Sequence, residues 1–246
     1  MKNLRLSAGC VLVLSMVMVS ACSSDDDEIF NPPVINDAAV LAALQEYVVP
    51  VVTVVNQAAF TLAGMARAKT MQQGCIPLEG FCTSGSVEWC EALVPPELRF
   101  DQCAAEGFVL DGTIQLSPGV GVYTMSFVDF SVDGLSMTGP VAINLASWPP
   151  CVDETFDAVM ITVDGSPGNL DGFLTACEGS EYPEGYLELV VSGPDGEPLT
   201  MSITAPHPGT QDPTEIMVVI TDASYTLVAT CTAVLGDTPS IDCVWE

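Results

Sequence analysis

The chain has 246 residues, of which 32 are acidic and 5 are basic, so its formal net charge at pH 7 is −27. So few cations exclude nucleic acid as a main partner, because phosphates are neutralised by Lys and Arg. Intrinsic disorder is also excluded, since 49% of the residues are hydrophobic and only 15% are charged. The length suits one large domain or two small ones.

The first residues have the features of an export signal. Lys2 and Arg5 give a positive start, and the apolar run 11–19 has the length of a signal h-region and is too short for a membrane span. The sequence Val19-Ser20-Ala21-Cys22 then follows, and it resembles the lipobox of bacterial lipoproteins. The resemblance implies that residues 1–21 are removed and that lipid is attached to the sulfur of Cys22.

Lipid at Cys22 implies a membrane-bound protein, because several acyl chains give a stable anchor. By the same resemblance Ser23, which follows the cysteine in place of Asp, favours the outer membrane. Residues 22–36 are acidic and polar, so we expect a tether between the lipid and the folded domain. Cys10 is disfavoured as the anchor because almost no apolar run precedes it. The remaining alternative is an ordinary secretory signal cut near Ala21.

Eight cysteines remain after the signal and the anchor, and an even number in an exported chain indicates four disulfides. They are Cys75, Cys82, Cys90, Cys103, Cys151, Cys177, Cys231 and Cys243. Cys231 and Cys243 are equidistant from Asp237 in a turn, which favours pairing across a hairpin, and Cys151 and Cys177 bracket a Gly-rich segment in the same way. The other four are expected to pair among themselves in an order that the sequence leaves open. A zinc site is disfavoured because six and seven residues lie between the closest cysteines, more than zinc sites favour.

The segment 37–73 predicts a long helix that begins at an N-cap in Asn36-Asp37. Its polar residues form a narrow strip, and the rest of its circumference is apolar, so we expect the helix to be largely buried. Pro50 predicts a kink or a break. Two alternatives exist: the β-branched run 48–55 also suits a strand, and the uncharged stretch 47–66 is long enough to span a membrane.

Two kinds of segment follow the predicted helix. The segment 74–107 contains four cysteines and three prolines and predicts an irregular, disulfide-held excursion with short helices around 87–90. From residue 108 to residue 246, short apolar runs alternate with turn signals, which is typical of an antiparallel meander. The candidate strands are 108–116, 122–132, 136–145, 156–163, 170–176, 186–191, 199–204, 215–221, 225–231 and 240–245.

These elements predict a single α+β domain over 37–246, in which a long N-terminal apolar helix packs on a large, curved, disulfide-stapled antiparallel sheet. In layout alone this resembles periplasmic lipoprotein carriers, with which the chain shares no motif. Fold does not determine function, so the resemblance implies no activity.

The sequence contains no strong catalytic signature. His207, the one histidine, lies between prolines in Pro206-His207-Pro208, which predicts a loop. The serine-hydrolase, P-loop and dinucleotide motifs are absent. Pairs of carboxylates are too numerous to be informative, so a hydrolase that uses two acids is a hypothesis without a specific signal. We therefore predict that the protein is not an enzyme and needs no cofactor.

Calcium is the one metal for which the sequence offers a candidate. Asp164, Asn169 and Asp171 bring oxygen ligands into a Gly-rich segment, and Ca²⁺ prefers such ligands. The spacing is not that of an EF-hand, and the same residues are ordinary turn formers. The turn interpretation is favoured over the calcium site.

Two functions fit these observations best. The first is a lipid-anchored, non-catalytic binding or structural module of the bacterial cell envelope. The second is a carrier of an apolar ligand, held in a cleft between the sheet and the helix. The sequence identifies neither the ligand nor the protein partner.

Overall fold

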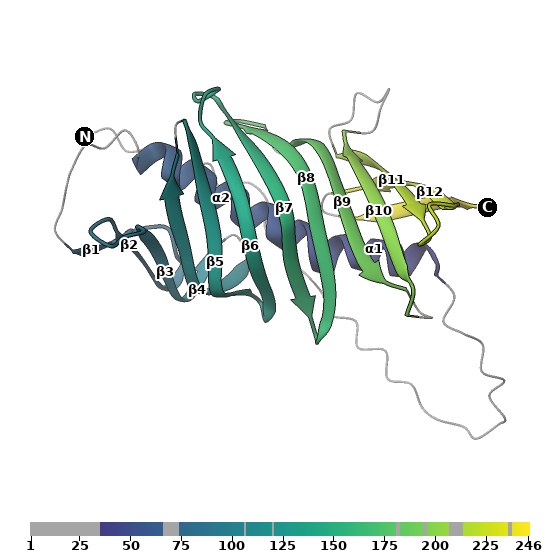
Figure 1. The fold of residues 1–246 in the computed structure, drawn as a ribbon, viewed down its shortest axis with the longest axis horizontal. Coiled ribbons are helices and arrows are strands. Elements are labelled where there is room, and N and C mark those ends of the chain that lie inside the picture. The colour runs from purple at the N-terminus through teal and green to yellow at the C-terminus, as the bar shows by residue number, and fades with distance from the viewer. Residues whose placement is uncertain are drawn as a thin grey trace, which may run out of the picture.

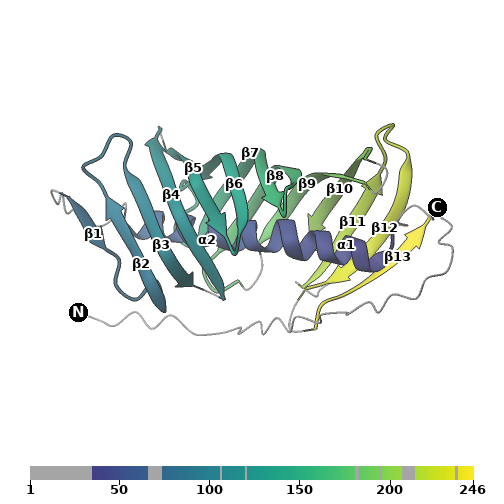
Figure 2. The same ribbon diagram turned by 90° about the horizontal axis from the view of Figure 1, so that it is seen from below.

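The computed structural model describes residues 35–65 and 74–246, except residues 106, 120, 181–182, 194–195, 207–213 and 236–237. Within these residues the protein consists of one antiparallel sheet and one helical segment that lies across its strands (Figure 1). Viewed from below, the sheet curves around the helix (Figure 2). The predicted combination of antiparallel sheet, helix and four disulfides is therefore present.

The helical segment has three parts: α1 (Asp37–Ala43), a π-helical stretch η1 (Leu44–Val48) and α2 (Val49–Met65). Asn36 caps it as predicted, because its Oδ1 accepts a hydrogen bond of 3.0 Å from the backbone N–H of Ala39. The predicted disturbance at Pro50 is the π-helical stretch just before it. Pro50 has no N–H to donate, and the wider turn avoids a clash between its ring and the preceding carbonyls. Residues 66–73 of the predicted helix lie outside the described residues.

The helix over Asp37–Gly64 is long and apolar enough to cross a membrane, with a mean hydropathy of 1.9. Length and composition alone support this possibility, because core helices of globular proteins have the same properties. In the structure 44% of its most apolar window is buried within the protein, against the concave face of the sheet.

Within the described residues the sheet contains 13 strands, each paired with its neighbours in the sequence. The strands are β1 (Cys75–Pro77), β2 (Ser84–Cys90), β3 (Glu97–Ala105), β4 (Phe108–Pro118), β5 (Val122–Val132), β6 (Leu135–Asn144), β7 (Cys151–Val163), β8 (Ser166–Cys177), β9 (Glu184–Ser192), β10 (Pro198–Ala205), β11 (Glu215–Thr221), β12 (Leu227–Val234) and β13 (Ser240–Trp245). All ten strands predicted after residue 108 correspond to β4–β13.

The irregular structure predicted for 74–107 is wrong, because this segment forms the first three strands of the sheet, whereas the disulfides predicted within it are present. The expected helix around 87–90 is part of β2, in which Val87 is buried and Glu88 is exposed. The Cys-rich segment looked irregular because its strands are separated by Pro and Gly turns. In the structure these strands are held by pairing with β4 and by two disulfides.

A recurring bulge curves the first half of the sheet. The strands β3, β5 and β7 each carry a bulge with a residue at positive φ: Gln102 at 46°, Asp129 at 48° and Ala158 at 51°. Each lies opposite a glycine of the preceding strand. At Gly112, for example, a Cβ would collide with the backbone oxygen of Asp129. Because bulges increase local twist and bend strands, this device helps the sheet to wrap around the helix.

The core lies between the helix and the concave face of the sheet. Apolar residues of the helix, such as Val51, Val55 and Ala59, are fully buried and belong to one cluster with inward-facing residues of β2–β12. Phe60 of α2 also contacts the ring of Trp148, in the connection between β6 and β7, with ring centroids 5.5 Å apart. Helix and sheet thus share one core, as the sequence predicts.

Candidate functional site

One carboxyl group lies inside the apolar core. Glu154 on β7 has no solvent exposure, and it is the one polar or charged residue that is buried in the described part of the chain. It alternates with the buried Val152 and Phe156, so the pleat of the strand points it toward the helix. Its paired neighbours on β6 and β8 are Ile143 and Leu174, both buried. Strand alternation therefore places an acid where an apolar residue is expected.

Asn56 of α2 is the hydrogen-bonding partner of this carboxyl group. When the side-chain amide of Asn56 is oriented with its nitrogen toward the carboxyl group, that nitrogen donates to Glu154 Oε1 at 2.8 Å and to Oε2 at 3.0 Å. Burial raises the pKa of Glu154 well above its usual value of 4.5, and no charged group contributes to the shift. The pair links the helix to the sheet across an apolar interface, and its environment favours the neutral form of the acid.

A second polar contact joins the helix to the sheet near the β7–β8 hairpin. The hydroxyl of Tyr47 donates to the backbone oxygen of Ser166 at 3.3 Å. Its ring lies against Gly168, where a Cβ would be 2.9 Å from Tyr47 Cδ1. Burial, followed by the nearby charges of Glu46 and Asp164, raises the pKa of Tyr47. The hydroxyl is therefore a stable hydrogen-bond donor.

All eight cysteines in the described part of the chain form disulfides. Cys231 is bonded to Cys243 and Cys151 to Cys177, which are the two pairs expected from the sequence. The four cysteines whose pairing was open form Cys75–Cys90 and Cys82–Cys103. Three of the four bonds join residues that face each other on neighbouring strands.

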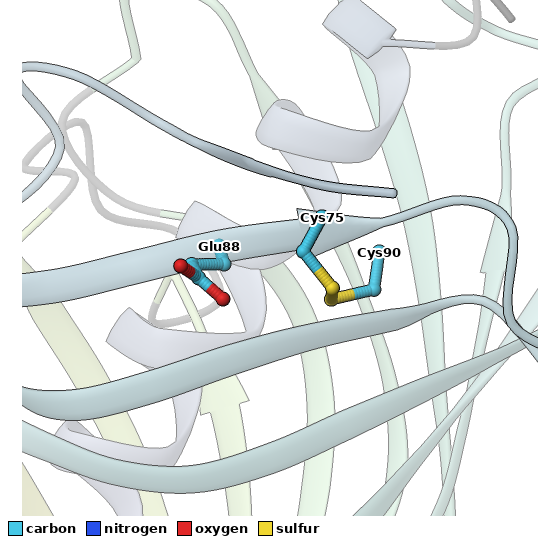
Figure 3. A group of neighbouring side chains, drawn as sticks. All are labelled: Cys75, Glu88 and Cys90. Atoms are coloured by element: carbon cyan, nitrogen blue, oxygen red, sulfur yellow. A yellow bond between two sulfur atoms is a disulfide. The ribbon is translucent and has the colours of Figure 1, made fainter. Parts of the chain in front are cut away.

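One disulfide has a carboxylate beside it. Glu88, Cys75 and Cys90 place their ligand atoms within 4.8 Å of one another at the β1–β2 end of the sheet (Figure 3). Two thiolates and a carboxylate would suit a transition metal. Both sulfurs are joined in the disulfide, however, so neither is a thiolate ligand. The Cys75–Cys90 disulfide therefore serves to link β1 covalently to β2.

One of the three calcium candidates, Asp164, lies apart from Asn169 and Asp171. Asp164 is in the turn between β7 and β8, whereas Asp171 is five residues into β8, about 17 Å along the strand. The carboxylate of Asp171 accepts from the backbone N–H of Ala158 at 2.7 Å and from the amide of Asn169 at 3.0 Å. Asp171 and Asn169 thus stabilise the β7 bulge. Asp111 bonds the N–H of Gln102 at 3.2 Å in the same manner on β4.

A small hollow lies on the face of the sheet that points away from the helix. It has a volume of about 180 Å³ and is lined by Met160, Asn169, Val190 and Pro198, among others. The Oδ1 atom of Asn169 is buried there without a hydrogen-bond partner. The hollow is open and lies on the opposite face from the predicted cleft for an apolar ligand.

Several predicted site residues lie outside the described part of the chain, namely Cys22, Cys10 and His207. Sequence reasoning missed Glu154, although the inward positions of Val152 and Phe156 on either side could have indicated it. No protein-family model, curated protein or solved structure matches this chain.

Proposed function

We propose that this protein is a lipid-anchored, non-catalytic binding or structural module of the bacterial cell envelope. The support for an exported protein is the lipobox-like sequence that ends at Cys22, together with four disulfides, which persist in oxidising compartments. The two features come from different parts of the chain, so they are independent arguments for the same location.

The observation that carries the binding or structural role is that the concave face of the sheet is filled by the protein's own helix (Figure 2). Glu154, the buried acid, is enclosed by Ile143, Leu174 and Asn56 and has no contact with water. A carboxyl group that acts as a general acid or base must reach its substrate. The arrangement therefore favours interactions through the outer surface and the sheet edges over chemistry inside the fold.

The proposal places the lipid on Cys22 and the domain at the outer membrane. In cells grown with labelled palmitate, the wild-type chain and the control variant Cys10→Ala are expected to incorporate label, and Cys22→Ala is expected to lose it. Separation of inner and outer membranes by density then tests the location. Label on Cys22→Ala, or a wild-type chain in the soluble cytoplasmic fraction, would contradict the proposal.

A carrier of an apolar ligand is the second candidate. This function is favoured by the apolar contact between the helix and the concave face of the sheet. An apolar ligand could take the place of the helix on that face. Binding then requires displacement of the helix. A fluorescent fatty acid is expected to bind Asn56→Leu more tightly than wild type if this function is correct, because the variant lacks the hydrogen bonds that hold the helix over Glu154. Equal, unsaturable fluorescence with both proteins would reject it.

A further inference from the structure

The last strand of the sheet has an unpaired edge. β13 pairs with β12 on one side, and within the described residues no strand pairs with its other side. The Cys231–Cys243 disulfide joins the two strands at their middle and fixes their register. An ordered edge of this kind is a template for an added strand.

The hydrogen bonds of β13 show which backbone groups face outward. The N–H of Glu246 donates to the oxygen of Val228 at 3.0 Å, so Glu246 directs its backbone toward β12. In an antiparallel pair this direction alternates from one residue to the next. The N–H and C=O groups of Ile241, Cys243 and Trp245 therefore point away from β12, toward the free side.

Exposed apolar side chains are concentrated at the same corner of the molecule. Of nine large apolar side chains that are exposed in the described part of the chain, four lie at the start of β12, in the turn before it, or at the end of β13. They are Tyr225, Leu227, Val244 and Trp245, exposed by 85%, 40%, 68% and 36%, and the indole N–H of Trp245 donates to Asp37 Oδ1 of α1 at 2.9 Å. Apolar groups gathered beside unpaired backbone groups are typical of an interaction surface.

The opposite edge of the sheet lacks these features. β1 has three residues and ends in Pro77, which has no N–H to offer a further strand. The two edges therefore differ in length and in hydrogen-bonding capacity, and β13 is the better template.

The charge of the chain determines the kind of partner that fits. Asp242 and Glu246 are exposed on or beside β13, and the whole chain has a net charge of −27. A second copy would bring the same charge to the edge and would be repelled, whereas a basic segment would be attracted. Charge complementarity thus favours a cationic partner over self-association.

We propose that the β13 edge binds an extended, basic segment of another protein, which adds a strand beside Ile241, Cys243 and Trp245. Apolar side chains of that segment contact Val244, and its Lys or Arg side chains pair with Asp242 and Glu246. This inference rests on the proposed role as a binding module and names its partner class.

The test uses the full mature protein in detergent and a labelled nine-residue peptide of alternating Lys and Val, with binding followed by fluorescence anisotropy. Ile241→Pro removes an outward N–H but no ladder hydrogen bond, and Val244→Lys places a cation beside the peptide. We expect both variants to bind at least about tenfold more weakly than wild type. Phe173→Ser, which removes an exposed side chain on β8, is the matched control and should bind as wild type does.

Three results would overturn the inference. One is equal affinity of the Lys peptide for wild type and for both edge variants, each shown to be folded by its unfolding transition. Another is equal affinity for a peptide with Glu in place of Lys. The third is a dimer in sedimentation that Ile241→Pro dissociates, which would assign the edge to a second copy. None of these results depends on lipid attachment at Cys22. The proposal for the β13 edge can therefore be rejected while the proposal for the lipid anchor still holds.

Discussion

The amide of Asn56 and the carboxyl group of Glu154 are hydrogen bonded across the interface between helix and sheet, and Glu154 is fully buried. The pair connects residues far apart in the sequence through one short contact. Because the surrounding groups are apolar, the ionised form of Glu154 is disfavoured and the pair is sensitive to pH.

Glu154 should make the protein less stable as pH rises. Its pKa is raised in the folded protein, so between the usual value of 4.5 and the raised value the folded state binds more protons than the unfolded chain. The contribution of Glu154 to stability is complete below the unfolded pKa and is lost as pH rises through the folded pKa, by about 1.4 kcal/mol per pH unit within that window. Glu154→Gln keeps the shape and removes the charge. Urea unfolding from about pH 5 to about pH 9 should show the variant more stable than wild type at the upper end, by a margin that grows with pH. A constant difference would contradict the assignment.

Removal of Asn56 should leave Glu154 without its partner. We expect Asn56→Ala to lower the free energy of unfolding by about 1–3 kcal/mol, the cost of an unsatisfied buried polar group. Gln57→Ala, at the adjacent, partly exposed position, is the control and should change stability by about 0.5 kcal/mol or less. Replacement of both partners, Asn56→Leu with Glu154→Leu, should recover most of the loss, because an apolar pair needs no desolvation of a polar group. Additive losses in the double variant would show that the two side chains are not coupled.

The contact between Tyr47 and Gly168 should be intolerant of added volume. Gly168→Ala places a methyl group 2.9 Å from the Tyr47 ring, and overpacking of this kind costs about 1–3 kcal/mol. Gly64→Ala is the control, because a Cβ there meets nothing within 4 Å and alanine favours a helix. Thermal unfolding should show a lower Tm for the first variant and an equal or higher Tm for the second. Equal behaviour would mean that the helix moves freely over β8.

Much of the fold was predictable because local rules determine it. The strands from β4 to β13 follow turn signals and alternation, and hairpin connections give their order. The strand β2 was missed because Val87-Glu88-Trp89-Cys90 is too short for its alternation to be read among prolines and glycines. The bond from Asn56 to Glu154 was missed because it depends on where the helix crosses the sheet, which no local pattern specifies. Asn169 and Asp171 were predicted as turn residues, with a calcium site as the less favoured alternative, because the bulge-stabilising contact of Asp171 with Ala158 is a tertiary feature.

The disulfides should stabilise the protein in proportion to the loops that they close. Cys151 and Cys177 are separated by 26 residues and Cys231 and Cys243 by 12. Loop-closure entropy gives about 3.5 kcal/mol for the longer loop and about 2.8 kcal/mol for the shorter one. Double Ala variants of each pair, compared by urea unfolding, should therefore lose stability in that order. A reversed order would indicate that effects on the folded sheet outweigh those on the unfolded chain.

Salt should stabilise the folded protein. Without Lys2 and Arg5, which belong to the proposed signal, the chain has three basic residues for 32 acidic ones, so most carboxylates have no cationic partner in the chain. In the described residues one of these three basic residues, Arg99, forms an ion pair with Glu97. Repulsion among the other acids opposes the compact state, and counterions screen it over about 10 Å at 0.1 M salt. Tm should therefore rise between about 10 mM and about 200 mM NaCl, by about 2–4 °C for each kcal/mol gained. MgCl₂ at equal ionic strength distinguishes screening from bound cations: an equal rise indicates screening, and a larger one indicates specific binding. A Tm that does not change with either salt would show that repulsion among the carboxylates does not measurably destabilise the folded protein.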